Sequence, residues 1–274
     1  FDMTETTPTF ETIDEARAGA EFVKNGYVIR EVEDRTALDQ IRGLIVEASS
    51  QHLGAANPDQ HQDHLDNISS HVGPDGLNDL RLSVINEMRD ASWFRAAYYA
   101  LAREMLSALV GNELAMQKNV NLSIQLPGDD SSLLPVHADV LNGDSPFEVV
   151  LWVPLVDCHG TKSMYLLSSE KNADIFNRMN EFASGNSEDL FDAVKDDLTW
   201  LEVPYGSYLL FSQNLLHGNR VNEEAETRWS MNCRFKSLFS PYADKKFGEF
   251  FEPITMRPAT RLGLRYQAPG NFGD

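Results

Sequence analysis

A change of hydrophobic pattern near residue 116 constrains the fold more than any other feature of the sequence. Over 116–126, apolar residues alternate with polar ones, which is typical of a strand with one buried face. Residues 147–157 are apolar on both faces, which predicts a central strand. Further strand-like segments follow at 163–168, 198–204, 206–212 and 227–239. Regular helices do not separate these segments, so the pattern favours an α+β or mainly-β fold.

The N-terminal part is predicted to be mostly helical. Apolar residues recur at helical spacing over 13–24, 35–52 and about 84–110. The Asn25-Gly26 pair ends the first of these helices, and a short strand is expected at 26–32. The polar segment 53–80 is predicted to be a long loop, and 171–197 to hold one or two helices. We therefore expect a barrel or sandwich with helices packed on one side.

Composition limits the partners of this chain. Its 274 residues carry a formal net charge of −19, so its surface would repel nucleic acid. No stretch approaches the roughly 20 apolar residues of a membrane span, and the polar N-terminus shows no secretory signal. Cys158 and Cys233 lie far apart without a C-x-x-C motif, which argues against a disulfide scaffold and a thiolate zinc site. This cysteine usage is typical of a reducing cytoplasm.

Three residues form a candidate metal site. His137 and Asp139 lie two residues apart in a strand region, so both side chains point to one side and can reach the same ion. His217 follows the apolar strand at 206–212. Two histidines and one carboxylate are the facial triad of non-haem Fe(II) oxygenases, in which further coordination positions stay open.

A candidate carboxylate receptor follows this site. Arg228 lies eleven residues after His217 and shares a strand face with Ser230. A guanidinium group binds a carboxylate through two parallel hydrogen bonds, and a neighbouring hydroxyl adds a third donor.

Together, His137-x-Asp139, His217 and Arg228-x-Ser230 resemble the motifs of the Fe(II)/2-oxoglutarate-dependent dioxygenases. The chain looks most like the phytanoyl-CoA-hydroxylase-like branch. The segment FVKNGYVIREV at 22–32 is similar to the opening helix and strand of that branch, and LWVPLVDCHGTKSMYLLSSEKN at 151–172 resembles its W-x-P-L…G…G-S-H stretch. The sequence departs from the pattern at 167–170, where Leu-Ser-Ser-Glu replaces Pro-Gly-Ser-His.

The resemblance implies a double-stranded β-helix, that is, a jelly-roll or cupin-like core with an N-terminal helical layer. It implies a single oxygenase domain over 1–274, with helical support and a lid to about 110, the core over about 116–240 and a C-terminal cover over 241–274. It also implies Fe(II) as the metal, 2-oxoglutarate and O2 as cosubstrates, and ascorbate as a candidate reductant. In halogenating relatives a small residue stands in place of Asp139, so this carboxylate favours hydroxylation or desaturation.

The resemblance also assigns roles to residues around the metal. His137, Asp139 and His217 would hold Fe(II), and Arg228 with Ser230 would hold the far carboxylate of 2-oxoglutarate. Two further residues are candidates for cosubstrate contacts, Gln125 and Asn219. Asn219 stands where many members of the family have serine.

The polar face of 116–126 is the candidate substrate surface. Its residues are Gln117, Asn119, Asn121, Ser123 and Gln125. Buried amides need hydrogen-bond partners, so a polar ligand is expected there, such as a sugar, an amino acid or a natural-product intermediate. The candidate substrate-binding residues are Asn119, Asn121, Ser123, Trp152 and Arg234. Trp152 also suits the core, and Arg234 suits either an anionic substrate group or a structural ion pair.

Two other functions compete with this interpretation. A metallohydrolase site would use the histidine-rich segment 52–71, namely His52, His61, His64, Asp66 and His71. That segment repeats the H-x-D spacing twice but lacks flanking strands. A non-catalytic or isomerising cupin-like barrel would bind a metabolite without oxygenation, and the Arg228-x-Ser230 pair argues against it.

Overall fold

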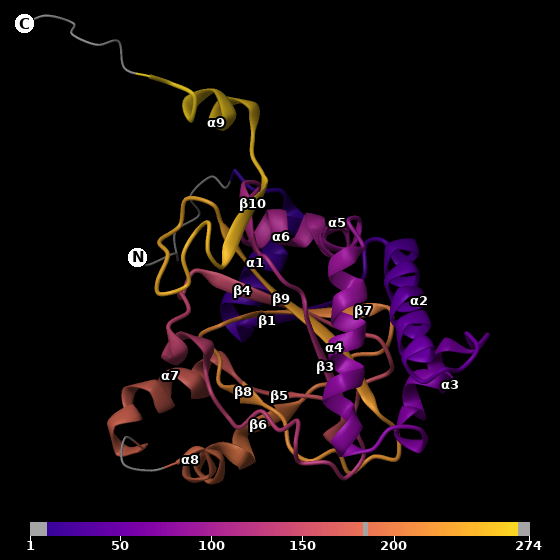
Figure 1. The fold of residues 1–274 in the computed structure, drawn as a ribbon. Helices are drawn as coiled ribbons and strands as arrows, with labels where there is room; N and C mark the ends of the chain where they lie inside the picture. Colours follow the sequence, from indigo (N-terminus) through magenta and orange to yellow (C-terminus); the bar gives the residue numbers. More distant parts are fainter. Residues whose placement is uncertain (1–9, 183–185, 268–274) are drawn as a thin grey trace, which may run out of the picture.

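Two antiparallel sheets form the centre of the computed structural model, which describes residues 10–182 and 186–267 (Figure 1). Within these ranges, the larger sheet has seven strands in the order β1-β7-β4-β9-β2-β10, with β3 also paired to β9, and the smaller sheet has the order β6-β5-β8. The strands are β1 (Tyr27–Glu31), β2 (Leu114–Gln117), β3 (Asn121–Gln125), β4 (Glu148–Pro154), β5 (Tyr165–Leu167), β6 (Leu198–Trp200), β7 (Ser207–Ser212), β8 (His217–Gly218), β9 (Arg228–Ser237) and β10 (Phe251–Thr255). The expected sheet-rich α+β arrangement is confirmed.

Strand β4 occupies the centre of the larger sheet, as its apolar sequence predicts. It pairs with β7 on one side and β9 on the other, so that Leu151 lies between Leu210 and Cys233. Every residue of β4 is buried. A strand covered on both faces needs apolar side chains at successive positions, which explains the continuous run.

Strand β9 separates two environments by simple alternation. Its odd-numbered residues Trp229, Met231, Cys233 and Phe235 belong to the main hydrophobic core. Its even-numbered residues Arg228, Ser230, Asn232 and Arg234 line a cavity on the opposite face of the sheet. The period of two in side-chain direction therefore places the polar residues of this strand together.

The polar segment 116–126 is not one continuous strand, which corrects our expectation. Met116 pairs with Phe235, whereas Asn121 pairs with Asn232, so the segment contains two residues more than its partner strand between these pairs. The excess forms a bulge between β2 and β3, and Asn119 is exposed there. Because the excess is an even number, Asn121 and Ser123 keep the orientation that the alternation predicts.

Helices cover the core-facing side of the larger sheet. Helix α1 (Ile13–Asn25) begins with a Thr12–Glu15 capping box and ends at Gly26, and α2 (Arg35–His52) begins after Asp34, which caps it. Both helices and the strand between them lie where the sequence predicts them. Helix α4 (Pro74–Asp90) packs between α2 and β3.

Two expectations for the N-terminal part are wrong. Segment 53–80 is not a long loop, because it contains α3 (His61–Asp66) and the first part of α4, whose proline stands at the helix start. The single helix expected over about 84–110 is instead the end of α4 followed by α5 (Phe94–Ala100) and α6 (Arg103–Leu109). The chain leaves helical geometry at Ala91, which lets Phe94 and Tyr98 turn into the core.

The smaller sheet has its own helical cover. Helices α7 (Ser169–Asn177) and α8 (Ser187–Val194) share a separate core cluster with β5. They confirm the helices expected over 171–197, although 183–185 lie outside the described residues. Figure 1 shows both helices on the far side of the smaller sheet from α2 and α4.

After β9 the chain adds β10 to the edge of the larger sheet beside β2 and then extends away as α9 (Pro258–Gly263) (Figure 1). The expected C-terminal cover over 241–274 includes 268–274, and the helical part over 1–110 includes 1–9; these end segments lie outside the described residues.

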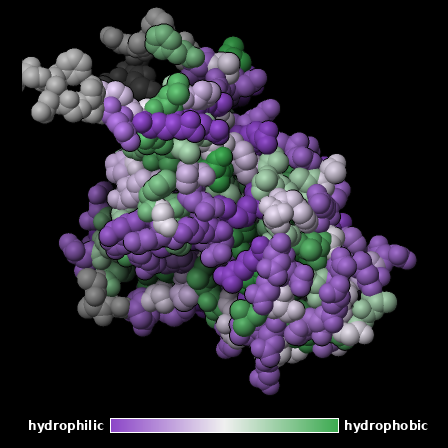
Figure 2. Space-filling model, turned by 45° about the horizontal axis from the view of Figure 1, so that its top comes forward, coloured by the Kyte–Doolittle hydropathy of each residue, from purple (hydrophilic) through white to green (hydrophobic). Residues whose placement is uncertain are grey.

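No helix among 10–182 and 186–267 is long and apolar enough to cross a bilayer. Hydrophilic side chains dominate the face in Figure 2, in keeping with the charge of the chain.

Candidate metal centre and cavity

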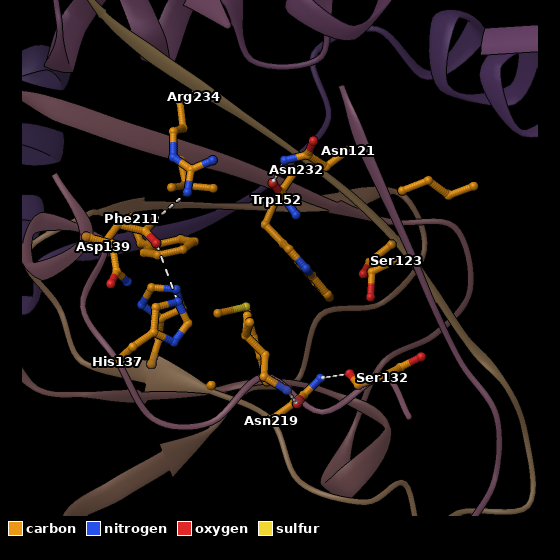
Figure 3. A pocket seen from close by; sticks show the side chains of 18 of the residues that line it. Asn121, Ser123, Ser132, His137, Asp139, Trp152, Phe211, Asn219, Asn232 and Arg234 are labelled. Atoms are coloured by element: carbon orange, nitrogen blue, oxygen red, sulfur yellow. Dashed lines mark hydrogen bonds and ion pairs between the residues drawn. The ribbon is translucent and has the colours of Figure 1, made fainter. Parts of the chain in front are cut away.

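His137, Asp139 and His217 come together beside the cavity (Figure 3). Their potential ligand atoms lie within 4.8 Å of one another, and no other such group occurs in the described part of the chain. The backbones of His137 and His217 exchange two hydrogen bonds, of 2.9 and 2.8 Å, so their rings stand side by side with centroids 4.3 Å apart. An antiparallel bridge thus joins residues that are 80 positions apart in the sequence.

Backbone carbonyl groups set the tautomer of both histidines. Nδ1 of His137 lies 2.7 Å from the carbonyl oxygen of Pro135, and Nδ1 of His217 lies 2.9 Å from that of Leu215. A carbonyl oxygen only accepts, so each Nδ1 carries the hydrogen and each Nε2 keeps a free lone pair. Burial and the nearby His137 together lower the pKa of His217 to about 4. His217 is therefore a neutral imidazole at neutral pH, as metal binding requires.

Asp139 completes the cluster from the start of a short 3₁₀ turn, η2 (Asp139–Asn142). Its Oδ1 lies 3.4 Å from Nε2 of His137, and its Oδ2 lies 3.2 Å from a terminal nitrogen of Arg234. Burial opposes ionisation of this carboxyl group, but the facing histidines and Arg234 outweigh burial and hold the pKa of Asp139 well below its usual range. The cluster thus offers one carboxylate and the imidazoles of His137 and His217.

A cavity of about 530 Å³ lies next to the cluster, within the range of small-molecule sites. Both sheets and helix α4 contribute to its wall. The lining residues include Arg81, Asn121, Ser123, Ser132, Trp152, Met164, Phe211, Asn219, Arg228, Ser230, Asn232, Arg234 and Lys245. Figure 3 shows Trp152 and Phe211 facing the same space as the triad.

Arg228 is buried at the cavity wall with no carboxylate in ion-pair contact among the described residues. It donates to the carbonyl oxygen of Ser163 at 3.1 Å and to Oγ of Ser123 at 3.2 Å. Its Nε and the Oγ of Ser230 have no hydrogen-bond partner. Burial lowers the pKa of Arg228 to about 10, so the group stays charged at neutral pH. A buried cation of this kind is costly unless an anion joins it, so the arrangement can accept an anionic ligand.

The two other candidates for cosubstrate contacts have different surroundings. Asn219 lines the cavity, but its Oδ1 accepts from the backbone N–H of Leu134 at 2.6 Å and its own N–H donates to the Leu134 carbonyl at 3.0 Å. It therefore fixes the segment 132–134 against β8. Gln125 is fully buried and donates to the carbonyl oxygen of Arg220 at 2.6 Å, so the structure does not bring it to the cavity.

Of the candidate substrate-binding residues, the structure brings four to the cavity and leaves out Asn119. Those at the cavity are Asn121, Ser123, Trp152 and Arg234. Asn119 is exposed because it lies in the bulge between β2 and β3. Asn121 donates to Asn232 at 2.9 Å, so the two amides act together (Figure 3). Trp152 is both buried and part of the cavity wall.

The histidine-rich segment 52–71 does not bring three potential ligand atoms together among the described residues. Nε2 of His64 lies 2.8 Å from Oγ of Ser49. Asp66 forms a 2.7 Å ion pair with the fully buried Lys162, which also pairs with Glu226 at 2.8 Å. These groups attach helix α3 to the rest of the fold, so their role is structural.

Arg81 is a cavity residue that our sequence reasoning missed. It extends from helix α4 and donates to the carbonyl oxygen of Ile124 at 3.3 Å and to Oγ of Ser132 at 3.0 Å. A signal was present, because Arg81 lies at helical spacing with the buried residues Leu77 and Val84. An arginine on the buried face of a helix needs polar partners there, which is a reason to expect a polar site.

Gly218 between His217 and Asn219 has no room for a side chain. A Cβ atom there would lie 2.6 Å from Oη of Tyr165 and 2.7 Å from the carbonyl oxygen of Leu134. We expect Gly218→Ala to cost about 1–3 kcal/mol of unfolding free energy and to weaken metal binding, because His217 or the segment 132–134 must move. Thermal unfolding and a metal titration check this. Gly19→Ala is the control, since nothing lies within 4 Å of its Cβ position; equal melting temperatures for both variants would contradict the prediction.

Glu148 at the start of β4 should make stability depend on pH. It is buried, and it accepts from the N–H of Ser145 at 3.1 Å and from Gln213 at 2.9 Å. Burial and the nearby Asp144 together raise the pKa of Glu148 to about 7. The folded state therefore holds this proton more tightly than the unfolded state, whose carboxyl group titrates near 4.5. The stabilisation that Glu148 provides is therefore complete below pH 4.5, the unfolded-state value, and is lost as the pH rises to about 7.

Glu148→Gln is expected to remove this dependence. Between pH 4.5 and 8, the unfolding free energy of the unmodified protein should fall relative to that of the variant by on the order of 2 kcal/mol, because one pKa unit corresponds to about 1.4 kcal/mol. Urea unfolding at several pH values measures the difference. Parallel stability curves for the two proteins would contradict the assignment.

Comparisons with known proteins identify the fold. No family model matches the sequence, and no curated protein matches it. Among solved structures, the nickel complex of the non-haem monooxygenase ThoJ aligns with a TM-score of 0.54 at 14% identity, over 93% of this chain and 89% of that one. HygX from Streptomyces hygroscopicus with nickel and 2-oxoglutarate bound aligns with a TM-score of 0.51 at 13% identity, over 86% and 90%. EctD from S. alaskensis with bound Fe aligns with a TM-score of 0.53 at 14% identity, over 83% and 78%. The chain therefore shares its fold with these non-haem enzymes.

Proposed function

We propose that this chain is an Fe(II)- and 2-oxoglutarate-dependent oxygenase that hydroxylates or desaturates a C–H bond of a small polar metabolite. One observation carries the proposal: a His-Asp-His cluster shares a cavity with the buried Arg228, which has no carboxylate in ion-pair contact among the described residues. We further propose that the two sheets form a double-stranded β-helix and that the chain belongs to the phytanoyl-CoA-hydroxylase-like branch. The fold similarity to HygX and EctD supports this assignment.

The donor set of the cluster suits Fe(II). Two neutral imidazole Nε2 atoms and one carboxylate oxygen leave three positions of an octahedral ion free. Bound Fe(II) would supply the redox chemistry that O2 and 2-oxoglutarate require. The hydrogen bonds from His137 and His217 to the backbone carbonyl groups of Pro135 and Leu215 hold both rings in the tautomer that binds a metal.

The residues around Arg228 suit the distal carboxylate of 2-oxoglutarate. The Nε of Arg228 and the Oγ of Ser230 are both buried and both lack partners, so a carboxylate between them would accept two hydrogen bonds. Arg228 and Ser230 point the same way because they are two positions apart on β9. In our proposal these two residues bind the cosubstrate and orient its other end toward the triad.

The remaining wall of the cavity suits a substrate that is small and polar. The linked amides of Asn121 and Asn232 can exchange hydrogen bonds with hydroxyl, amine or carboxyl groups. Trp152 and Phe211 add apolar surface that would pack against the carbon skeleton. In this proposal, the volume of about 530 Å³ also contains the cosubstrate, which restricts the space for the substrate.

The test needs no knowledge of the substrate. Purified protein is supplied with Fe(II), 2-oxoglutarate and ascorbate in air, and succinate is measured over time. We expect slow succinate formation that stops when either Fe(II) or 2-oxoglutarate is omitted. The nickel-loaded protein should also bind 2-oxoglutarate in a calorimetric titration. Failure of the nickel-loaded protein to bind 2-oxoglutarate would overturn the proposed function.

A further inference from the structure

Arg234 lies between two buried carboxylates at the edge of the metal cluster. One of its terminal nitrogens is 3.2 Å from Oδ2 of Asp139, and its Nε is 3.2 Å from Oδ1 of Asp144. Lys245 pairs with the other oxygen of Asp144. The Asp144 side chain is fully buried, and the side chains of Asp139 and Arg234 are 8% and 15% exposed. The guanidinium therefore faces a carboxylate on each side, and Figure 3 shows the contact with Asp139.

This contact gives the two oxygens of Asp139 different surroundings. Oδ1 faces Nε2 of His137 at 3.4 Å and so points toward the position that a metal would take. Oδ2 faces Arg234 instead. A carboxylate with one oxygen held by a guanidinium group has only the other oxygen to offer to an ion. Asp144 in turn fixes the guanidinium, and the planar fork of arginine can span two carboxylates where the point charge of lysine cannot.

We propose that Arg234 is a positioning residue, which makes Asp139 bind the metal through Oδ1 alone. This inference rests on the proposed function only for the identity of the metal. With one oxygen from Asp139 and two histidines, a six-coordinate ion keeps three open positions; with both oxygens it would keep two. A two-point chelating cosubstrate together with a second reactant needs all three. The ion pairs with Asp139 and Asp144 correspond to the structural ion pair that the sequence left open for Arg234 beside a substrate contact.

The binding mode of Asp139 can be measured with a metal ion alone. In a crystal structure of the unmodified protein soaked with Ni(II), we expect Oδ1 as the single oxygen ligand from Asp139, with Arg234 on Oδ2. In Arg234→Met, both oxygens should coordinate. In solution, water-proton relaxation measures the number of water molecules bound to Mn(II). We expect Mn(II)-loaded Arg234→Met to hold one bound water fewer than the Mn(II)-loaded unmodified protein. Coordination by both oxygens in the unmodified protein would overturn the proposal, whatever the variants do.

Affinities separate positioning from a general structural role. Arg234→Met removes a positive charge close to the divalent ion, so its affinity for Mn(II) should equal or exceed that of the unmodified protein. A site that had lost its structure would instead bind Mn(II) more weakly. Binding of 2-oxoglutarate to the Mn(II)-loaded variant should fall at least tenfold, and Arg234→Lys should restore part of it. Arg220→Met is the control, since it removes an arginine that pairs with Glu188 away from the cavity, and it should keep the original number of bound waters.

These outcomes are distinct from the failure of the proposed function. If the unmodified protein loaded with Ni(II) does not bind 2-oxoglutarate, the proposed oxygenase is wrong, and the number of oxygens that Asp139 contributes is still read from the crystal structure. If Arg234→Met binds Mn(II) more weakly and retains all bound waters, Arg234 serves only the stability of the site and the positioning role is overturned.

Discussion

Asp139→Ala and His217→Ala are each expected to abolish metal-dependent succinate formation. Either change leaves two protein ligands, which hold a divalent ion too weakly for it to remain bound at micromolar concentrations. Asp139→Ala also leaves Arg234 without one of its two carboxylates beside the ion. Metal content after dialysis, together with succinate release, measures the effect. We expect the stoichiometry to fall from about one Fe(II) per chain to background in both variants.

The histidine-rich segment supplies the control for this experiment. His61 and His64 belong to helix α3, and His64 is engaged with Ser49 rather than with the cluster. His61→Ala and His64→Ala should therefore keep their iron and most of their activity. Loss of iron in these variants, with iron retained in His137→Ala, would mean that the metal binds at a different H-x-D sequence.

Arg228→Met is expected to raise the 2-oxoglutarate concentration needed for half-maximal succinate formation more than tenfold. The proposed carboxylate would lose a charge-assisted hydrogen bond and its buried counter-charge, a loss that typically costs about 2–5 kcal/mol. Iron binding should persist, because Arg228 has no contact with the three ligands. The measurement is a 2-oxoglutarate titration at saturating Fe(II), with iron content determined in parallel.

A second arginine in the same region of the sequence provides a matched control. Arg220 pairs with Glu188 at 2.7 Å on the surface and does not line the cavity. Arg220→Met should leave the 2-oxoglutarate requirement within about twofold of the unmodified protein, since exposed ion pairs contribute little. An unchanged requirement in Arg228→Met would remove that residue from the cosubstrate site.

The sequence predicted the strands and the metal cluster because both depend on local patterns. Apolar runs located β4 and β7, and alternation located β9, because burial of a strand face leaves a period of one or two in hydrophobicity. Three copies of H-x-D occur, and the strand context of His137 distinguished it from the copies at His61 and His64. The structure brings His137, Asp139 and His217 together, but the expected shared strand is wrong: His137 forms an isolated bridge with His217, and Asp139 begins the 3₁₀ turn η2.

Local patterns failed where the chain changes direction or where distant charges meet. The bulge that exposes Asn119 depends on the register of two segments against β9, and that register is a tertiary property. Helix α4 begins in a polar segment, and only two of its buried residues, Leu77 and Leu80, lie within 53–80, which is too few to show the helical period there. The contact of Arg234 with Asp139 joins residues 95 positions apart, and only the folded structure shows it.

The alternation along β9 also has a consequence for how such a chain can diverge. The four residues that face the cavity and the four that face the core are interleaved on one strand. Point substitutions at the cavity positions can change ligand recognition while the other face keeps its hydrophobic packing. Insertion or deletion of a single residue would exchange the two sets and bury arginines in the core. We therefore expect homologous chains that act on other substrates to differ at Asn232, while Arg228, Ser230, Arg234 and the length of this strand stay constant.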